Sequence, residues 1–202
     1  MASAARRGSN AMSIGSILDR TKDFSIAVDG GAHHGTWSRE MGRRFRRTYA
    51  FEICPTAYIQ LVTNVAMSFL LETVTPLNVA LGAENKEVFF CGDKTPSSPV
   101  KRVYPADATE RGTPSIPILM VRLDSLELPS LGFLKTDLQG YDYFALLGAE
   151  KTINRFHPVI YLEIDLPSQE TFGVVGKAQE LLTQWGYKEL LKFGDEALWG
   201  FN

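Results

Sequence analysis

The chain alternates short apolar runs with stretches that carry helical signals, and this alternation constrains its fold more than any other feature. Strand-like runs are predicted at 25–28, 48–52, 75–81, 87–91, 118–123, 132–137 and 158–164. Helices are predicted over 36–47, 55–69, 141–153 and 168–185, with Ser168 as the cap of the last one. Strands that alternate with helices form a mostly parallel sheet that helices cover on both faces. Two final runs, 187–193 and 197–201, flank Gly194-Asp195 and predict a hairpin.

The length of 202 residues suits one domain, which we expect to span 12–202. Residues 1–11 end in Ser-Asn-Ala before Met12, a pattern that resembles the remnant of an expression tag, so they are excluded from the fold. Residues 92–116 hold or adjoin five of the ten prolines and show no apolar period. They predict a long loop, and loops of this length are often functional. This loop is therefore either a candidate flap over a substrate or an ordinary surface loop.

Charge and cysteine content exclude several classes of protein. The formal net charge is −2 and the pI is about 5.9, so the chain has no general attraction to nucleic acids or anionic membranes. Arg39, Arg43, Arg46 and Arg47 share one predicted helix face, which is more typical of a solvated face than of a phosphate site. Two cysteines are too few for a disulfide framework, and no run approaches a membrane span. We therefore expect a cytoplasmic protein.

Four of the predicted strands end in or beside a carboxylate. These residues are Asp29, Glu52, Asp137 and Glu163. Ligands of parallel sheets bind outside the carboxyl ends of the strands. Carboxylates gathered at one edge repel each other unless a cationic ligand, a metal or a basic partner joins them. The ligand is therefore expected to carry positive charge.

The turn after the first strand reads Asp29-Gly30-Gly31-Ala32-His33-His34-Gly35. A dinucleotide would place its pyrophosphate at this turn, where Asp29 would repel it by on the order of 4 kcal/mol at about 4 Å. S-adenosylmethionine avoids this conflict, because it has an ammonium and a sulfonium group and no phosphate. Asp29 could hold its ammonium side directly or through water, and Glu52 could accept both ribose hydroxyls. NAD sites also have an acidic residue at the second strand, so Asp29 is the discriminating residue.

The two loop histidines allow more than one interpretation. Exposed neighbours such as His33 and His34 are more often bystanders than functional groups. One of them could instead cover the cofactor or act as a base, since imidazole titrates near neutral pH. Neither has a third ligand at a metal-like spacing, so zinc is not predicted.

Several ordered motifs together resemble the FkbM family of methyltransferases. They are AVDGGAHHGTWS, FEICP, NVALG (78–82), RLDSL (122–126), LKTDLQGYDYFALLGAEKTI and PVIYLEI, and they cover about 25–165. The most specific block is 134–149, with a strand, Asp, a variable residue, Gln, Gly and a helix that ends in Gly-Ala. The resemblance implies a class I methyltransferase fold, which is a Rossmann-like, doubly wound sheet of seven strands with an antiparallel C-terminal hairpin.

The resemblance also implies roles for individual residues. The cofactor loop would consist of Asp29, Gly30, Gly31, Ala32 and Gly35, with Glu52 on the ribose. Asn78 and Ala80 would lie near the adenine, and Asp137 and Gln139 would face both the cofactor and the transfer site. Two positions depart from the family pattern. His33 stands where Asn is common, and Gln139 stands where Glu is common, which removes one candidate acid or base.

The function that the resemblance implies is methyl transfer from S-adenosylmethionine to a hydroxyl oxygen of a small molecule or sugar. Asp137 is the first candidate for the base that removes the hydroxyl proton, and His33 or His34 is the second. Asp137 could also cap a helix or bind the cofactor's amino group. Glu163 could join Asp137 in holding a divalent cation, although no residue pattern establishes a metal.

Three alternatives stay open at this point. They are a non-catalytic Rossmann-like binding module, an NAD-dependent oxidoreductase and a nucleic-acid methyltransferase. The presence of both expected cofactor carboxylates, Asp29 and Glu52, argues against a non-catalytic module. Asp29, and Ala32 in place of a glycine, argue against an NAD-dependent oxidoreductase. The third lacks a basic track with aromatic platforms. The sequence leaves the acceptor molecule and the oligomeric state open.

Overall fold

The computed structural model describes residues 12–91, 102–104 and 115–201. Within these ranges the chain forms a seven-stranded sheet in the order β10-β11-β9-β8-β1-β2-β3. Its strands are β1 (Ile26–Gly30), β2 (Arg47–Phe51), β3 (Val74–Leu77), β8 (Phe133–Thr136), β9 (Val159–Glu163), β10 (Tyr187–Phe193) and β11 (Glu196–Phe201). Neighbours from β9 to β3 pair in parallel, and β11 is antiparallel to both β9 and β10. The predicted fold class, including the C-terminal hairpin, is confirmed.

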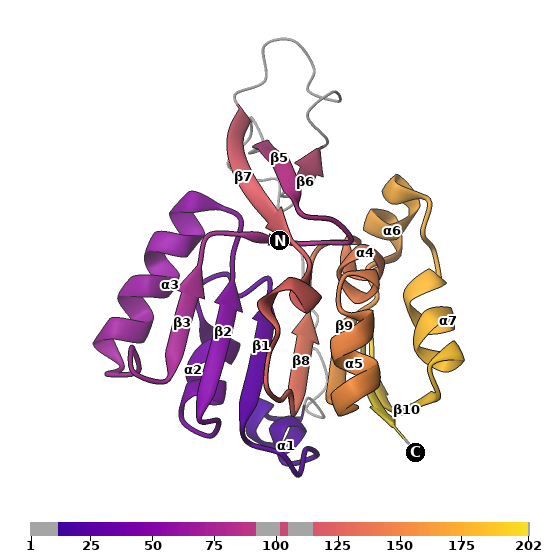
Figure 1. Cartoon of the computed structure of the whole chain (residues 1–202), viewed down its shortest axis with the longest axis horizontal. Coiled ribbons are helices and arrows are strands. Elements are labelled where there is room, and N and C mark those ends of the chain that lie inside the picture. Colours follow the sequence, from indigo (N-terminus) through magenta and orange to yellow (C-terminus); the bar gives the residue numbers. More distant parts are fainter. Residues whose placement is uncertain (1–11, 92–101, 105–114, 202) are drawn as a thin grey trace, which may run out of the picture.

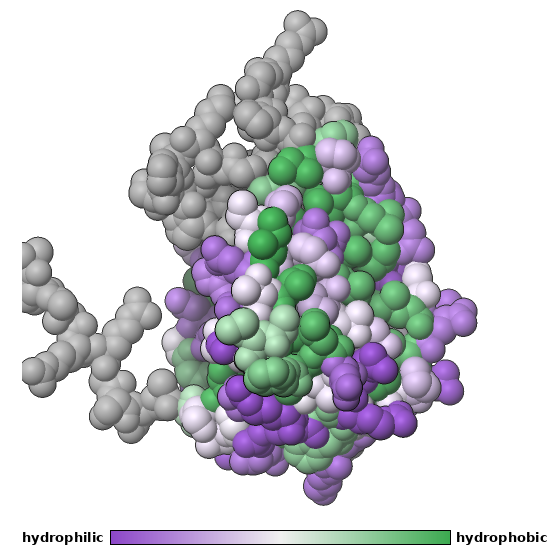
Figure 2. Space-filling model, turned by 90° about the vertical axis from the view of Figure 1, so that its left-hand side faces the viewer, coloured by the Kyte–Doolittle hydropathy of each residue, from purple (hydrophilic) through white to green (hydrophobic). Residues whose placement is uncertain are grey.

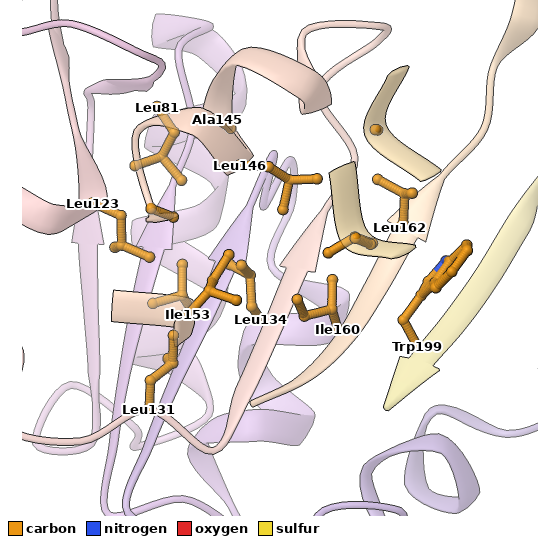
Figure 3. Close-up of a cluster of buried hydrophobic side chains, with 14 of the residues drawn as sticks. Leu81, Leu123, Leu131, Leu134, Ala145, Leu146, Ile153, Ile160, Leu162 and Trp199 are labelled. Atoms are coloured by element: carbon orange, nitrogen blue, oxygen red, sulfur yellow. The ribbon is translucent and has the colours of Figure 1, made fainter. Parts of the chain in front are cut away.

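Helices cover both faces of this sheet (Figure 1). They are α1 (Ile14–Leu18), α2 (Thr36–Gly42), α3 (Pro55–Met67), α4 (Asp142–Leu147), α5 (Glu150–Phe156), α6 (Leu166–Phe172) and α7 (Lys177–Gln184), with a 3₁₀ turn η1 at Leu123–Leu126. Side chains of α4, α5 and α7 pack on one face against β8 and β9, as Figure 3 shows for Leu146, Ile153, Leu134 and Ile160. Side chains of α1 and α2 pack on the opposite face. The sheet is therefore buried on both sides, as its apolar strands require.

A second, smaller sheet has the order β4-β7-β5-β6. Its strands are β4 (Ala80–Leu81), β5 (Lys86–Cys91), β6 (Arg102–Tyr104) and β7 (Ser115–Val121). It projects beyond the edge at which β1, β2 and β8 end (Figure 1). The predicted loop over 92–116 is thus wrong at β6 and at the start of β7. The rest of that loop, and residues 1–11, lie outside the described residues.

In the amino-terminal half of the chain, one predicted strand is split and one predicted helix is shorter than expected. The strand expected over 75–81 divides because the Asn78 side chain bonds to the Glu52 and Ile53 carbonyls, after which β4 pairs with β7. The helix expected over 36–47 ends at Gly42, and Arg47 already pairs as the first residue of β2. The four arginines of that stretch therefore share no single helix face.

Two further helices divide in the carboxyl-terminal half. The helix expected over 141–153 breaks after Leu147, because the Gly148 carbonyl accepts the Asp124 N–H and leaves the helical ladder. The helix expected over 168–185 becomes α6 and α7, with Gly173 and Gly176 at positive φ between them. Ser168 is not its cap, since Asp165 precedes the first turn.

At the centre of the sheet, Asp29 of β1 lies beside Lys135 of β8 in register. The Lys135 Nζ is 3.1 Å from Asp29 Oδ1 and 3.5 Å from Asp137 Oδ2. The side chains of Asp29 and Lys135 are 0% and 3% exposed. Burial opposes the charge of Lys135, but the nearby Asp29 and Asp137 charges outweigh it and raise the pKa of Lys135 above its usual value. The two residues therefore form a buried ion pair.

The side of the molecule formed by α3 and β3 carries apolar residues on its surface (Figure 2). Ile59, Met67, Phe69 and Leu71 are all more than half exposed there. None of the helices within the described ranges has the length and hydropathy that a bilayer crossing requires.

The buried pair makes a stability prediction. Lys135→Met leaves the buried Asp29 charge without its partner, so we expect a loss of about 3–5 kcal/mol of unfolding free energy. Urea denaturation followed by circular dichroism measures this loss. Combining Asp29→Asn with Lys135→Met should cost less than Lys135→Met alone, because no buried charge is left unpaired.

The control is Lys188→Met, which removes an exposed lysine from a strand of the same sheet and should change stability little. If Lys135→Met is as mild as Lys188→Met, the buried Asp29 carboxylate does not depend on the charge of Lys135.

Candidate active site

A cavity of about 390 Å³ opens at the carboxyl ends of the central strands. This is the place where ligands of open α/β sheets bind. Its walls come from the ends of β1, β2, β8 and β9 and from β4. The lining residues are Gly31, His33, Phe51, Glu52, Ile53, Val79, Ala80, Leu81, Asp137, Leu138, Gln139, Tyr141 and Glu163.

The glycine-rich turn forms the floor of this cavity at Gly31. Gly31 has a φ of +75°, and a Cβ there would lie 2.0 Å from the Asp137 carbonyl oxygen. Any side chain at this position would therefore push the turn away from the end of β8. The N–H groups of Gly31 and Ala32 both bond to the Phe51 carbonyl, which ties the turn to β2. Gly30, Ala32 and Gly35 shape the turn but do not line the cavity.

Glu52 lies at the end of β2 with its carboxylate facing the cavity. Its Oε2 accepts the His33 N–H at 2.8 Å, and its Oε1 accepts the Cys54 N–H at 2.7 Å. Two backbone donors thus hold the carboxylate in one orientation. Each oxygen keeps further lone pairs, so the pair of oxygens can accept two adjacent hydroxyl groups.

Asp29 does not line the cavity, although the sequence suggested that it could contact a ligand directly. Its side chain is fully buried beneath the turn. Ser38 Oγ donates to Asp29 Oδ2 at 2.5 Å, and Lys135 neutralises Oδ1. Lys135 also donates to the carbonyls of Gly30 and Gly31. Asp29 is therefore linked to the turn through Lys135. The expectation that Asp29 contacts a ligand directly does not hold, because its side chain is buried beneath the turn.

The opposite wall of the cavity carries a group of polar side chains from β8, β9 and the turn between β8 and α4. Gln139 Nε2 lies 3.1 Å from both carboxyl oxygens of Glu163 and 3.4 Å from Asp137 Oδ1. Gln139 has a φ of +54°, a strained conformation that turns its side chain towards both acids. One amide thus joins the two carboxyl groups at the rim.

Burial and mutual repulsion shift the protonation of two acids in this region. Burial, with the nearby charges of Asp137, Asp142 and Asp165, raises the pKa of Glu163 to about 9. Asp142 lies just behind this wall and is 1% exposed. Burial and the charge of Asp137 raise the pKa of Asp142 to about 6, against a hydrogen bond from the Leu138 N–H. Strongly shifted acids in a cleft are typical of functional sites.

Some of the remaining predicted residues line the cavity, and others lie around it. His33 and His34 are both exposed and stack their rings with centroids 3.6 Å apart, but of the two it is His33 that lines the cavity. Ala80 lines the wall with its neighbours on β4. The Asn78 side chain instead holds backbone carbonyls at the end of β2. The structure thus brings together His33, Ala80, Asp137, Gln139 and Glu52, and leaves His34 and Asn78 outside the lining.

Lys135 and Asp142 were missed by the sequence reasoning. A signal existed for Lys135, because it is a charged residue inside the run Phe-Leu-Lys-Thr of a strand that is buried on both faces. Such a residue needs a buried partner. Asp142 gave no signal, since an acid in a first helical turn is ordinary. Across the described ranges, no three His, Cys, Asp or Glu side chains are grouped so as to hold a metal ion.

Comparison with solved structures supports the fold assignment. Methyltransferase FkbM from Methylobacillus flagellatus KT has a TM-score of 0.62 and 17% identity, and 89% of this chain aligns with 44% of that protein. The present chain therefore spans less than half of that relative's length. An rRNA methylase from Streptococcus thermophilus has a TM-score of 0.54 and 11% identity, with 93% of each chain covered.

A third similar structure is SMU.1697c from Streptococcus mutans in complex with SAH, with a TM-score of 0.54, 10% identity and 92% and 94% coverage of the two chains. No curated protein matches the sequence. The sequence profile described as the methyltransferase FkbM domain matches residues 29–189, which is most of the chain. The chain belongs to the FkbM family of S-adenosylmethionine-dependent methyltransferases.

Proposed function

We propose that this protein transfers a methyl group from S-adenosylmethionine to a hydroxyl oxygen of a small molecule or sugar. The observation that supports it most is the cavity itself. One wall carries Glu52, a carboxylate fixed by two backbone N–H groups, and the other carries Asp137, Gln139 and Glu163. The first wall suits a ribose diol, and the second suits the reacting groups.

In this proposal, the cofactor lies across the ends of β2, β1 and β8. Glu52 accepts the ribose hydroxyls, and the apolar wall of Val79, Ala80 and Leu81 packs against the adenine. The methionine part then passes over Gly31, where no side chain stands in its way. In this orientation the methyl-bearing end would lie beside Asp137.

Asp29 has an indirect role here. Lys135 neutralises Asp29, so the repulsion between Asp29 and a pyrophosphate is weaker than the sequence alone suggested. The choice of S-adenosylmethionine over NAD therefore rests on membership of the family rather than on the charge of Asp29.

The chemistry requires in-line displacement at the methyl carbon, with the thioether as leaving group. The protein supplies alignment, water exclusion and a group that accepts the hydroxyl proton. Asp137 is the first candidate for that group, because its side chain lines the cavity and is 38% exposed. Lys135, at 3.5 Å, and Gln139 hold its carboxylate in place. His33 also lines the cavity and is the second candidate, while His34 lies outside the lining.

The charge of the site favours a neutral acceptor. Several acids surround the transfer region, and Lys135 pairs with Asp29 and Asp137 beneath it. A polyanionic acceptor such as RNA would meet uncompensated negative charge there. An rRNA methylase shares the fold, but RNA binding requires a basic surface, and the described residues that line this cavity include no lysine or arginine.

The cofactor assignment predicts a binding defect for Glu52→Gln. This change removes the charge that strengthens two hydrogen bonds to the ribose, so we expect S-adenosylmethionine affinity to fall about 10- to 100-fold. Isothermal titration calorimetry measures the change. Glu72→Gln, an exposed acid far from the cavity lining, serves as the matched control and should bind normally. Equal affinity in both variants would show that Glu52 does not bind the ribose.

The acid–base assignment predicts a defect in turnover for Asp137→Asn. This variant should bind S-adenosylmethionine but lose about 10²-fold or more in methyl transfer, because the amide cannot take the hydroxyl proton. The assay incubates radiolabelled cofactor with a panel of sugars and hydroxylated metabolites and counts transferred methyl groups. Normal turnover by this variant on an acceptor that the wild type methylates would exclude Asp137 as the base.

A further inference from the structure

Among the residues that the structure describes, the acids at the transfer end of the cavity outnumber the cations that pair with them. Four acids lie around one edge: Asp29 in β1, Asp137 directly after β8, Asp142 at the start of α4 and Glu163 at the end of β9. Within the described ranges, the ion pairs of this group join Lys135 to Asp29 and to Asp137, and no ion pair includes Asp142 or Glu163. Acids that are buried or half-buried in this arrangement cannot all be ionised without large cost.

Glu163 is the member of this group whose surroundings favour a proton most strongly. Acids face it from every neighbouring element: Asp137 at the end of β8, Asp142 in α4, Asp165 before α6 and Glu196, its register partner on β11. The nearest donor is the neutral amide of Gln139. With a pKa raised to about 9, Glu163 is protonated at pH 7, whereas Asp142, with a pKa of about 6, is mostly ionised.

The cofactor and its product differ by one positive charge. S-adenosylmethionine carries a sulfonium, and S-adenosylhomocysteine carries a neutral thioether in its place. Glu52 and Glu163 stand on opposite walls, since β9 and β2 are separated by β8 and β1 in the sheet. A cofactor whose ribose binds Glu52 therefore extends its charged sulfur towards Asp137 and Glu163.

We propose that Glu163 holds a proton in the free enzyme and releases it to solvent when S-adenosylmethionine binds, whereas S-adenosylhomocysteine leaves the proton in place. This inference rests on the proposed function. The positive charge of the sulfonium offsets the negative charges of the surrounding acids, so Glu163 can lose its proton and become ionised. Glu163 thereby makes the affinity for donor and for product depend differently on pH.

The same exchange closes the reaction cycle. During transfer, the acceptor oxygen forms a bond to the methyl carbon, the carbon–sulfur bond breaks with its electrons going to sulfur, and the hydroxyl proton is lost to the acidic group. The site thus loses the sulfonium charge and gains a proton in one turnover. The proton gained during transfer therefore leaves Glu163 protonated in the complex with the neutral product, and Glu163 keeps this proton after the product leaves, until the next sulfonium binds.

The test is calorimetric titration at pH 7 in two buffers of different ionisation enthalpy. At this pH the α-amino groups of both ligands are mostly protonated. Wild-type protein should release about one proton per S-adenosylmethionine bound and close to none per S-adenosylhomocysteine. Glu163→Gln should bind S-adenosylmethionine without proton release. Glu170→Gln, which alters an exposed acid on α6, is the matched control and should behave as the wild type.

The other outcomes separate the two proposals. Binding of neither ligand by folded wild type would overturn the proposed function, and this inference with it. Binding of S-adenosylmethionine without proton release, or with undiminished release from Glu163→Gln, would overturn the inference alone. If Asp142→Asn abolished proton release and Glu163→Gln did not, the proton would belong to Asp142, and this result would also overturn the inference.

A second measurement needs no cofactor. The folded state holds the Glu163 proton up to about pH 9, whereas the unfolded chain loses it near the ordinary glutamate pKa of 4.5. The folded state therefore binds more protons between these values, and this acid lowers stability as pH rises through the window. Relative to the wild type, Glu163→Gln should gain thermal stability from pH 5 to pH 9. A constant difference across this range would contradict a proton on Glu163.

Discussion

The buried ion pair between Lys135 and Asp29 is the interaction on which the rest of the site depends. It joins the two central strands, β1 and β8, at the level where both reach the cavity. The same ammonium contacts the carbonyls of Gly30 and Gly31 and the carboxylate of Asp137. One buried charge thus connects the sheet, the glycine-rich turn after β1 and the cavity wall at Asp137. An ion pair of this kind adds little net stability, but its geometry is well defined because either charge alone would be costly to bury.

Much of the fold was predictable because apolar runs and breaks between them determine where strands lie. The strands around Asp29, Glu52 and Asp137 and the C-terminal hairpin were predicted close to their observed bounds. The helix boundaries were less predictable, because tertiary contacts set them. Gly148 leaves its helix because its carbonyl bonds to Asp124, a residue more than twenty positions earlier. No local pattern reports such a contact.

The site, too, was predictable where local sequence determines it and not where distant contacts do. Glu52 was recognisable from its place after the second strand, and Gly31 from the turn that required it. The burial of Asp29 was not, because its environment depends on Lys135, which arrives from a strand more than a hundred positions away. The raised pKa of Glu163 likewise reflects acids from β8, α4 and the start of α6. Residue type and spacing predicted which side chains meet at the edge, but not how their charges are distributed.

The close approach of Gly31 to the Asp137 carbonyl has a consequence for how such an enzyme can diverge. The turn after β1 and the end of β8, which the proposed function assigns to donor and acceptor, meet there along bare backbone, with no space for a Cβ between them. Their separation is therefore independent of rotamers, and neither region can shift by exchanging side chains at the contact. Substitutions on the surrounding walls can then alter which acceptor enters while the line of attack on the methyl carbon stays the same. A glycine with no chemistry of its own would in this way preserve one reaction across many substrates.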